Sequence, residues 1–387
     1  MLALLALALA APAYDDHGLV LVPPETGPFL GGINAPSVEW DGGSEQYVMY
    51  FESQASTVEV PEDCYSYYRI GRATSPDGAA WTIDEAFSFD PDHADAEGTY
   101  RCAATQPAVL YDGATWHLFF TGGTTDEGRG RNEPSGILHA TSADGIDWAV
   151  APEPVVPPEA NGIGLASATL VNGTLHVVYS QYPHLMLATA LASSDTWTLG
   201  VDPVVDNATL GEWAATWAFG PSLGCADDGS FSMTFGGDSA GAVRTLAAAT
   251  SPDALTWSVE QPVTVGALDS TTLNHWDVLA HDGGASTMWY SRTDEATGLK
   301  AVGLATSGDT SGHRRGRSCP DPWPPPPDDT GDTGDTGAAA DTGTPADTAG
   351  AGDTGDKPSG DDGCGCQSAP AAGLAPLALL VLGRRRR

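Results

Sequence analysis

Basic residues are scarce in this chain. Its 387 residues include 16 lysines and arginines against 51 aspartates and glutamates, which gives a formal net charge of −35. An acidic excess of this size repels nucleic-acid phosphates and anionic lipid headgroups at long range. The sequence therefore excludes DNA and RNA as partners and favours neutral or cationic ones.

Several motifs that carry chemistry are also missing. The chain has no Walker phosphate loop, no dinucleotide-binding Gly-x-Gly-x-x-Gly and no Gly-x-Ser-x-Gly nucleophile elbow. Residues 14–319 contain no Cys-x-x-Cys pair of the kind that binds structural zinc. These absences exclude the nucleotide-binding folds and the α/β-hydrolase fold that such motifs identify.

Long apolar runs are absent as well, and the two short ones lie at the ends. Residues 1–13 are rich in Leu and Ala and end in Ala-Pro-Ala, which resembles a secretory signal with a small-residue cleavage site. The alternative is a buried apolar N-terminus. The run at 369–383 is shorter than the ~20 residues of a bilayer span, and arginines 384–387 follow it, as in a cytoplasmic anchor. We expect an exported protein, at the cell surface or outside the cell.

What the chain does contain is a repeated phrase, Ala-Thr-Ser-x-Asp-Gly-x-x-Trp. Complete or nearly complete copies occupy residues 73–81, 140–148 and 249–257, a worn copy lies at 192–197 and a truncated one at 305–309. Copies spaced by roughly 50 to 65 residues indicate five copies of one supersecondary unit. In the copies at 73–81 and 140–148 the Asp-Gly pair predicts a tight turn, with Asp capping backbone amides and Trp restarting a strand beneath the turn.

The residues around each phrase predict four short antiparallel strands per unit. In the second unit, strands at 106–111 and 116–123 flank an Asp-Gly turn, 137–141 forms a third strand and the Trp148 segment a fourth. The predicted fold is all-β, a five-bladed β-propeller of four-stranded antiparallel blades. The fifth blade lacks its Trp strand, so residues 17–22 could supply it and close the ring. Closure by residues after Ser307 is the alternative.

Composition divides the chain into four parts. Residues 1–13 form the signal peptide, 14–319 the propeller, 320–362 a stalk and 363–387 a tail. The stalk combines a polyproline run with Asp-Thr-Gly repeats and has few apolar side chains to bury, which predicts a disordered acidic segment. We expect weak ion screening there rather than a calcium site, and a monomeric protein overall.

The cysteines suggest disulfides, because an exported protein occupies an oxidising compartment. Four lie in the propeller, and three pairings are conceivable. We favour Cys64–Cys102, near one face of the first two blades, and Cys225–Cys319, which would pin the end of the ring to a turn of blade four.

The tail contains Cys364 and Cys366, the short apolar run and the terminal arginines. This combination resembles the C-terminal sorting tails of myxobacterial surface proteins. The resemblance implies processing or modification at one of the two cysteines and attachment to the outer surface or membrane. A plain tail anchor is the alternative.

In a propeller, ligands gather where the innermost strands begin. The residues expected to converge there, or on the surrounding rim, form the predicted ligand-binding set: Asn34, Gln106, Ser167, Trp217, His275, Asp277 and Arg292. Trp217 could stack on a sugar face.

The Pro-x-Val first strands and the repeated boxes make residues 30–310 resemble the five-bladed glycoside hydrolases of families 43 and 32. That resemblance implies an acid at the start of each of the first three inner strands. This chain has Asn34 in the first, Gln106 in the second and Gly164 to Ser167 in the third, so the carboxylates that glycoside hydrolysis requires are missing there.

Three hypotheses therefore stay open. The first is a propeller that binds a glycan without hydrolysing it. The second is a divergent glycoside hydrolase that uses Asp277, Asp238 or Glu52, and the third is a surface structural protein without a ligand. The resemblance also implies a channel calcium near His275, although a hydrogen-bonded channel histidine is favoured over a metal ligand. No other cofactor is predicted.

Overall fold

The structure is a computed structural model. It describes residues 12–54, 68–88, 103–123, 135–159, 162–226, 228–239, 244–268 and 272–310, together with 316, 317 and 319. All of these residues lie in one compact unit, Met1–Asp328. The predicted stalk, the tail with Cys364 and Cys366, most of the predicted signal segment and the Cys64–Cys102 pair lie outside the described residues. In the part that is described, no helix is both long and apolar enough to cross a membrane.

The described chain is built almost entirely of strands, in five consecutive groups that we call repeats one to five. Repeat one contains β2 (Asn34–Asp41), β3 (Gln46–Gln54), β4 (Tyr68–Ser75) and β5 (Thr82–Ile83), and repeat two contains β6 (Ala103–Tyr111), β7 (Trp116–Gly123), β8 (Ser135–Ser142) and β9 (Ala149–Val150). Repeat three contains β11 (Ile163–Val171), β12 (Thr174–Gln181), β13 (His184–Leu191) and β14 (Thr198–Leu199). Repeat four contains β15 (Trp217–Cys225), β16 (Phe231–Asp238), β17 (Arg244–Ser251) and β18 (Ser258–Val265). Repeat five contains β19 (Trp276–Ala280), β20 (Ser286–Thr293) and β21 (Lys300–Ser307).

Three elements stand outside this pattern. The strand β10 (Val156–Glu159) pairs with β8, and the short helix α1 (Asn207–Leu210) and the 3₁₀ turn η1 (Glu212–Ala214) connect repeats three and four. Within every repeat, successive strands pair antiparallel, as the sequence predicted.

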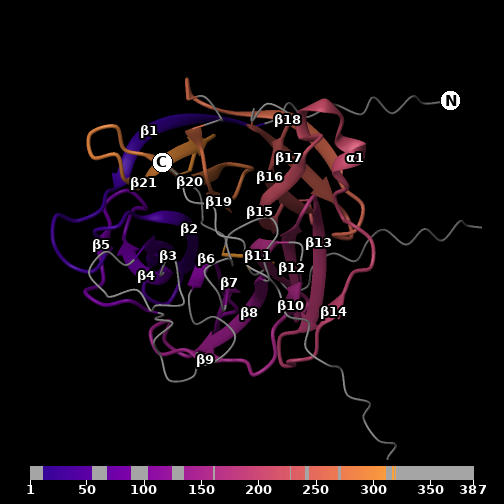
Figure 1. The fold of residues 1–387 in the computed structure, drawn as a ribbon, viewed down its shortest axis with the longest axis horizontal. Coiled ribbons are helices and arrows are strands. Elements are labelled where there is room, and N and C mark those ends of the chain that lie inside the picture. Colours follow the sequence, from indigo (N-terminus) through magenta and orange to yellow (C-terminus); the bar gives the residue numbers. More distant parts are fainter. Residues whose placement is uncertain are drawn as a thin grey trace, which may run out of the picture. The chain divides into compact units, whose positions relative to one another are not determined.

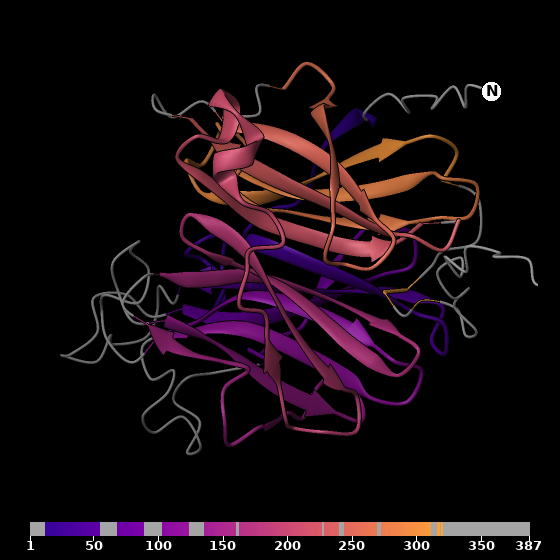
Figure 2. The same ribbon diagram turned by 90° about the vertical axis from the view of Figure 1, so that its right-hand side faces the viewer.

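The five repeats are arranged in a closed ring. Their first strands β2, β6, β11, β15 and β19 each contact the next, and β19 contacts β2 (Figure 1). Neighbouring sheets face each other, as repeats three and four do in Figure 2. Each pair of neighbouring repeats shares one cluster of buried apolar side chains, including the pair formed by repeats five and one. Burial between repeats is what holds the ring together, because each sheet can cover its apolar face only against its neighbour.

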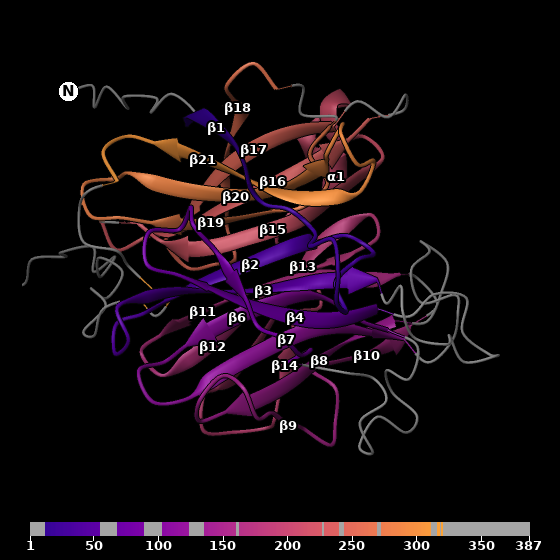
Figure 3. The ribbon, with the colours of Figure 1, turned by 90° about the vertical axis from the view of Figure 1, so that its left-hand side faces the viewer.

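The N-terminal strand closes the ring. β1 (Ala13–Leu21) pairs antiparallel with β21, from Asp15 opposite Thr306 to Leu21 opposite Val302, and so becomes the outer strand of repeat five (Figure 3). The strand begins earlier than the predicted 17–22 segment, at the last residue of the predicted signal. Of the two closures that the sequence left open, the structure has the N-terminal one.

The repeated box forms the turn that was predicted from it. In repeat one, the Asp77 carboxylate accepts hydrogen bonds from the amides of Ala79 and Ala80, at 2.9 and 2.8 Å. The Trp81 indole donates to the carbonyl oxygen of Gly78, at 3.0 Å. Asp144 and Asp253 accept the corresponding amide bonds in repeats two and four. The box is therefore scaffold, at the outside of each repeat.

Candidate functional site

The first strands are irregular where they begin. Four of them carry a shift of register within their first few residues, in which a residue with positive φ faces the centre of the ring. The four residues are Ala35 (φ 47°), Gln106 (φ 53°), Leu165 (φ 51°) and Gly220 (φ 60°). Bulges of this kind re-aim side chains and are common next to binding sites, and three of these four residues are not glycine. We call the region around these residues and His275 the channel mouth.

In four of the five repeats a side-chain oxygen of the first strand ties that strand to the next: in repeats one, three and four it is a hydroxyl two residues beyond the bulge, and in repeat five it is a carboxylate. Repeat two has Ala108 at this position. The side-chain oxygen accepts a hydrogen bond from a backbone amide of the neighbouring repeat: Ser37 from Val109, Ser167 from Leu223, Ser222 from Val278, and Asp277 from Val38, at 2.7–2.9 Å. Asp277 thus does in repeat five what serine does in repeats one, three and four. Asp277 therefore joins β19, the first strand of repeat five, to β2, the first strand of repeat one.

Asp277 has two further partners. Its carboxylate accepts a hydrogen bond from the Ser222 hydroxyl at 2.9 Å and forms an ion pair with the Arg317 guanidinium. The residue is 5% exposed. A carboxylate with three donors, one of them cationic, is held in one orientation. This arrangement is suited to holding the ring.

Arg317 reaches these residues from the other end of the first strands. It is 2% exposed and donates to the Ser167 hydroxyl at 3.1 Å and to the Leu223 carbonyl oxygen at 2.7 Å. Its backbone amide donates to both carboxylate oxygens of Glu39, at 3.2 and 3.1 Å. One residue therefore joins first strands of repeats one, three, four and five.

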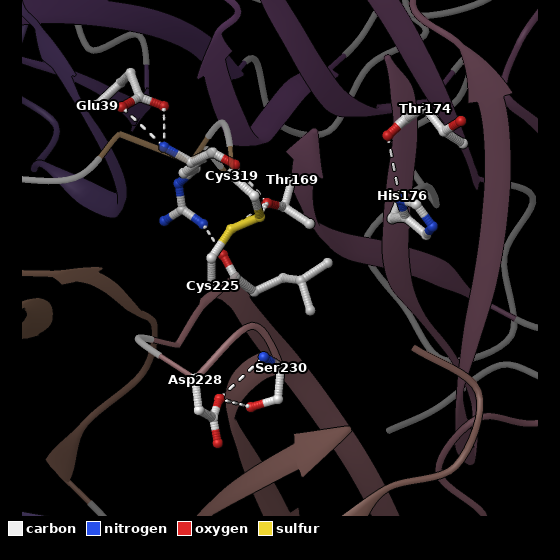
Figure 4. Close-up of a disulfide and its surroundings, with 10 residues drawn as sticks. Glu39, Thr169, Thr174, His176, Cys225, Asp228, Ser230 and Cys319 are labelled. Atoms are coloured by element: carbon white, nitrogen blue, oxygen red, sulfur yellow. Dashed lines mark hydrogen bonds between the residues drawn. A yellow bond between two sulfur atoms is a disulfide. The ribbon is translucent and has the colours of Figure 1, made fainter. Parts of the chain in front are cut away.

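A disulfide fixes this segment. Cys319 is bonded to Cys225 at the end of β15, with a Cα–Cα distance of 5.8 Å, which is the pairing favoured for these two cysteines (Figure 4). The Cys319 amide donates to the Leu170 carbonyl oxygen at 2.8 Å. Burial raises the pKa of Glu39 to about 7, and the charge of Arg317 acts against that rise.

The cavity at the channel mouth is small. Ser37, Ser167, Asp277 and His275 line it together with the bulge residues, and its volume of about 30 Å³ is enough for one or two water molecules. A sugar ring does not fit into it, so a ligand at this end would lie across the mouth and not within the channel.

Polar side chains of the mouth are fixed by hydrogen bonds. The Gln106 carbonyl oxygen accepts from the Leu165 amide at 3.0 Å and from the Thr121 hydroxyl at 2.9 Å. His275 and Asn34 make a contact of 3.3 Å between Nδ1 and Oδ1. The predicted set of Asn34, Gln106, Ser167, His275 and Asp277 is thus brought together around one end of the ring, with Ser167 and Asp277 on its inner wall.

The other two candidate carboxylates lie on the rim in different repeats. Glu52, on β3, is 2% exposed and accepts from the Asn34 amide at 3.2 Å and from the Thr105 hydroxyl. Asp238, at the end of β16, is 6% exposed and lies 3.5 Å from the guanidinium of Arg244. Each carboxylate is held by partners of its own.

Aromatic rings border the mouth in repeat four. Trp217, at the start of β15, is half-buried and packs against Phe219 at 4.9 Å and Tyr182 at 5.9 Å between ring centroids. Arg292 lies further out, in a second cavity at repeat five. Among the described residues, no cluster of three or more histidines, cysteines, aspartates or glutamates is placed to hold a metal ion.

Sequence reasoning missed the ring of bonds and Arg317. The recurring Pro-Ser at 36–37 and 221–222, with Ala-Ser at 166–167, was a usable signal, because a buried serine at one place in a repeat needs a common partner. Arg317 belongs to a basic run just before Cys319 in an otherwise acidic chain, and that run was a second signal.

No known protein-family model matches the sequence, and no curated protein matches it. Solved structures do match. A glycosyl hydrolase from Bacteroides ovatus superposes with a TM-score of 0.59 at 14% identity, over 79% of this chain and 96% of the other. A glycoside hydrolase of family 117 from Zobellia galactanivorans gives 0.56 at 13% identity, over 76% and 90%. The catalytic domain of a family 62 α-L-arabinofuranosidase from Coprinopsis cinerea gives 0.53 at 13% identity, over 78% and 99%.

The chain is therefore structurally similar to five-bladed propeller glycoside hydrolases. At such low identity the likeness is one of fold, and function has to be argued from the site itself.

Proposed function

We propose that this chain is a five-bladed β-propeller that binds a glycan across its channel mouth without hydrolysing it. The observation that carries the proposal is the composition of the mouth. Amides and an imidazole stand where the first strands begin, and Asp277 is the one carboxylate in the wall of that cavity. Asp277 is occupied in closing the ring.

The mouth has the features that sugar recognition uses. Asn34 and Gln106 supply donors and acceptors for hydroxyl groups, and their orientation is set by hydrogen bonds within the protein. Trp217 offers a half-buried ring at the start of β15, the first strand of repeat four. A sugar presents both an apolar face and hydroxyls, so an aromatic ring together with fixed amides complements it.

Hydrolysis is supported less well. It needs two carboxyl groups on either side of the glycosidic bond, one of which can give up a proton. Glu52 and Asp238 are both buried and each is held by its own partners, Glu52 by an amide and a hydroxyl and Asp238 by a guanidinium.

Residues 14–319, prepared with the disulfide intact, should be applied to a glycan array. Binding should then be quantified by calorimetry, and release of reducing sugar should be measured on the same sample. We expect binding without turnover. Trp217→Ala should weaken binding by roughly 3- to 10-fold, because the ring contact is lost. Leu255→Ala, at an exposed position in the box of repeat four, is the matched control and should leave affinity unchanged.

Turnover that disappears in Glu52→Gln or Asp238→Asn would overturn the binding-only proposal in favour of a divergent hydrolase. No binding to any glycan, by a sample that unfolds cooperatively, would overturn glycan recognition altogether.

A further inference from the structure

A second cavity, which we call the rim pocket, lies beside the channel mouth. It has a volume of about 650 Å³ and lies between the outer end of repeat five and the connection from repeat four. Asn274 lines it, one residue before His275 of the mouth. The pocket is also close to the start of β2, because the Ile33 amide donates to the Lys300 carbonyl oxygen at 2.8 Å. A ligand lying across the mouth would therefore reach it.

Cationic side chains gather at this pocket, in a chain whose formal charge is −35. Arg292 and Lys300 both line it, and both are half-buried. Arg244 lies next to it, 3.5 Å from the Asp238 carboxylate, and donates to the Asn274 side chain at 3.1 Å and to the Leu273 carbonyl oxygen at 3.2 Å. Three of the 16 basic residues thus lie around one cavity, and they come from different strands.

The cations are close enough to affect each other. Burial lowers the pKa of Lys300, and the charge of Arg244 lowers it further. The Lys300 ammonium donates to the Thr293 hydroxyl at 3.0 Å and so is held by a neutral partner. Grouped cations of this kind, in a cavity, are a common mark of a site for an anionic ligand.

Two acidic residues share the pocket and bear on its charge. The Asp294 carboxylate is used by its own turn, where it accepts from the Ala296 amide at 3.1 Å and the Thr297 hydroxyl at 2.7 Å. Glu295 is exposed at the edge. Asp294 keeps its negative charge while it accepts these bonds, since the bond from Thr297 and, to a smaller extent, the charge of Arg292 lower its pKa, so Asp294 and Glu295 both oppose an incoming anion.

We propose that the rim pocket recognises the carboxylate of a uronic acid residue in the glycan that lies across the channel mouth. This inference rests on the proposed glycan binding and names the class of sugar. A uronate carries its carboxylate outside the sugar ring, on C5, so the carboxylate can enter the rim pocket while a neighbouring residue of the chain rests at the mouth. Arg292 suits a carboxylate because its planar guanidinium can donate two parallel hydrogen bonds to it, and Lys300 adds a compact charge.

The test compares paired ligands that differ only in charge. Tetragalacturonate and tetraglucuronate are each titrated into residues 14–319 by calorimetry, alongside their methyl esters. We expect the acids to bind roughly tenfold or more tightly than the esters, since a hydrogen bond to a charged group is worth a factor of that order. Raising the salt concentration should weaken binding of the acids and leave binding of the esters unchanged.

Single substitutions test whether the preference for the acids arises at the rim pocket. Arg292→Gln should reduce affinity for the acids roughly tenfold without changing affinity for the esters, and Lys300→Gln should act in the same direction. Glu295→Gln should strengthen binding of the acids, whereas Glu153→Gln, exposed on repeat two, is the control and should have no effect.

Equal affinity for acids and esters, or an Arg292→Gln variant that weakens both alike, would overturn the uronate inference and leave glycan binding standing. If the array shows binding only to neutral glycans, the inference likewise fails alone. If no glycan of any kind binds, the proposed function fails, and the uronate inference fails with it.

Discussion

Some residues at the centre of this ring have structural roles that cannot be inferred from the chemistry of their side chains alone. Asp277 is an acid in the wall of the channel mouth, yet its carboxylate takes the place that a serine hydroxyl has in the bonds between other first strands. It also neutralises Arg317, which is buried at the other end. Removing one member of such a buried pair leaves the other without its counter-charge.

Asp277→Ser keeps an acceptor for the Val38 amide but leaves Arg317 without its carboxylate. We expect a loss of roughly 3–5 kcal/mol in the free energy of unfolding, measured by urea denaturation, because a buried charge becomes unpaired. The double variant Asp277→Ser with Arg317→Met removes both charges and should lose much less. If the single and double variants lose the same free energy of unfolding, the ion pair between Asp277 and Arg317 does not contribute as expected. Glycan affinity of the folded variants should be unchanged.

A second residue-scale effect concerns two histidines in repeat two. His117 on β7 and His139 on β8 are buried, with 3.0 Å between Nδ1 of the first and Nε2 of the second, and Asp112 lies 3.4 Å from the other nitrogen of His117. The His139 ring stacks on Phe119. Burial lowers the pKa of His139 to about 3, and the charge of His117 lowers it further. Burial also lowers the pKa of His117.

These lowered pKa values predict acid sensitivity. Below pH 6.5 the unfolded chain binds protons at these histidines that the folded chain does not bind, so stability is complete above that pH and falls as the pH drops toward 3. Each histidine contributes a slope of up to about 1.4 kcal/mol per pH unit. His139→Phe, which should fit the same aromatic stack, is expected to flatten the pH dependence of the unfolding free energy between pH 6.5 and 4. An unchanged slope in urea titrations across that range would refute this.

At the scale of elements, the turn of each box is also a contact with the neighbouring repeat. Gly145 (φ 70°) lies in the box turn of repeat two, and its carbonyl oxygen accepts from the Tyr50 hydroxyl of repeat one. In repeat one, the Gly78 carbonyl oxygen accepts from the Trp289 indole of repeat five at 2.8 Å. The boxes therefore both shape their own repeat and dock it on the one before.

Alanine substitutions at two glycines can separate the cost of the backbone conformation from the cost of the contact between repeats. A Cβ at Gly145 would come within 2.7 Å of the Tyr50 hydroxyl, whereas a Cβ at Gly113 (φ 94°) would meet nothing within 4 Å. Gly113→Ala should cost about 1–2 kcal/mol for its backbone conformation alone, and Gly145→Ala should cost roughly 1–3 kcal/mol more because the repeats must move apart. Unfolding curves of the two variants, measured side by side, give this difference directly. Equal costs would show that the contact with Tyr50 adjusts freely.

The elements also mark what the sequence could predict. Strands, Asp-Gly turns and the count of five repeats follow from local patterns, because alternation and turn residues act within a few positions. The bulges at Ala35, Gln106 and Leu165 do not, since a non-glycine residue takes a positive φ only where the surrounding ring requires it. The same holds for Arg317, whose partners are supplied by strands far apart in the chain.

For the whole molecule, the two ends of the described chain secure the ring by different means. At the N-terminal end, β1 adds a strand to β21, and its Tyr14 is buried between repeats four and five. At the C-terminal end, Arg317 is held by Glu39 and Asp277, and Cys319 by the disulfide to Cys225. A ring that is closed within repeat five, by the pairing of β1 with β21, gains most from links that join distant parts of the chain, because these restrict the unfolded chain most.

The disulfide can be tested as such a link, since 94 residues separate its two cysteines. Replacing both Cys225 and Cys319 by Ser should lower the free energy of unfolding by roughly 2–5 kcal/mol, and the melting temperature by roughly 5–15 °C. The reason is that the segment carrying Arg317 is then tethered only by hydrogen bonds and one ion pair. Glycan affinity should stay unchanged at temperatures where the variant is folded, because Arg317 keeps its ion pair with Asp277 and its hydrogen bond to Ser167 in the wall of the mouth. A melting temperature equal to that of the unaltered protein, measured by circular dichroism, would show that Arg317 alone holds the segment. Lost affinity in a folded variant would show instead that the disulfide, at the other end of the first strands, influences the shape of the channel mouth.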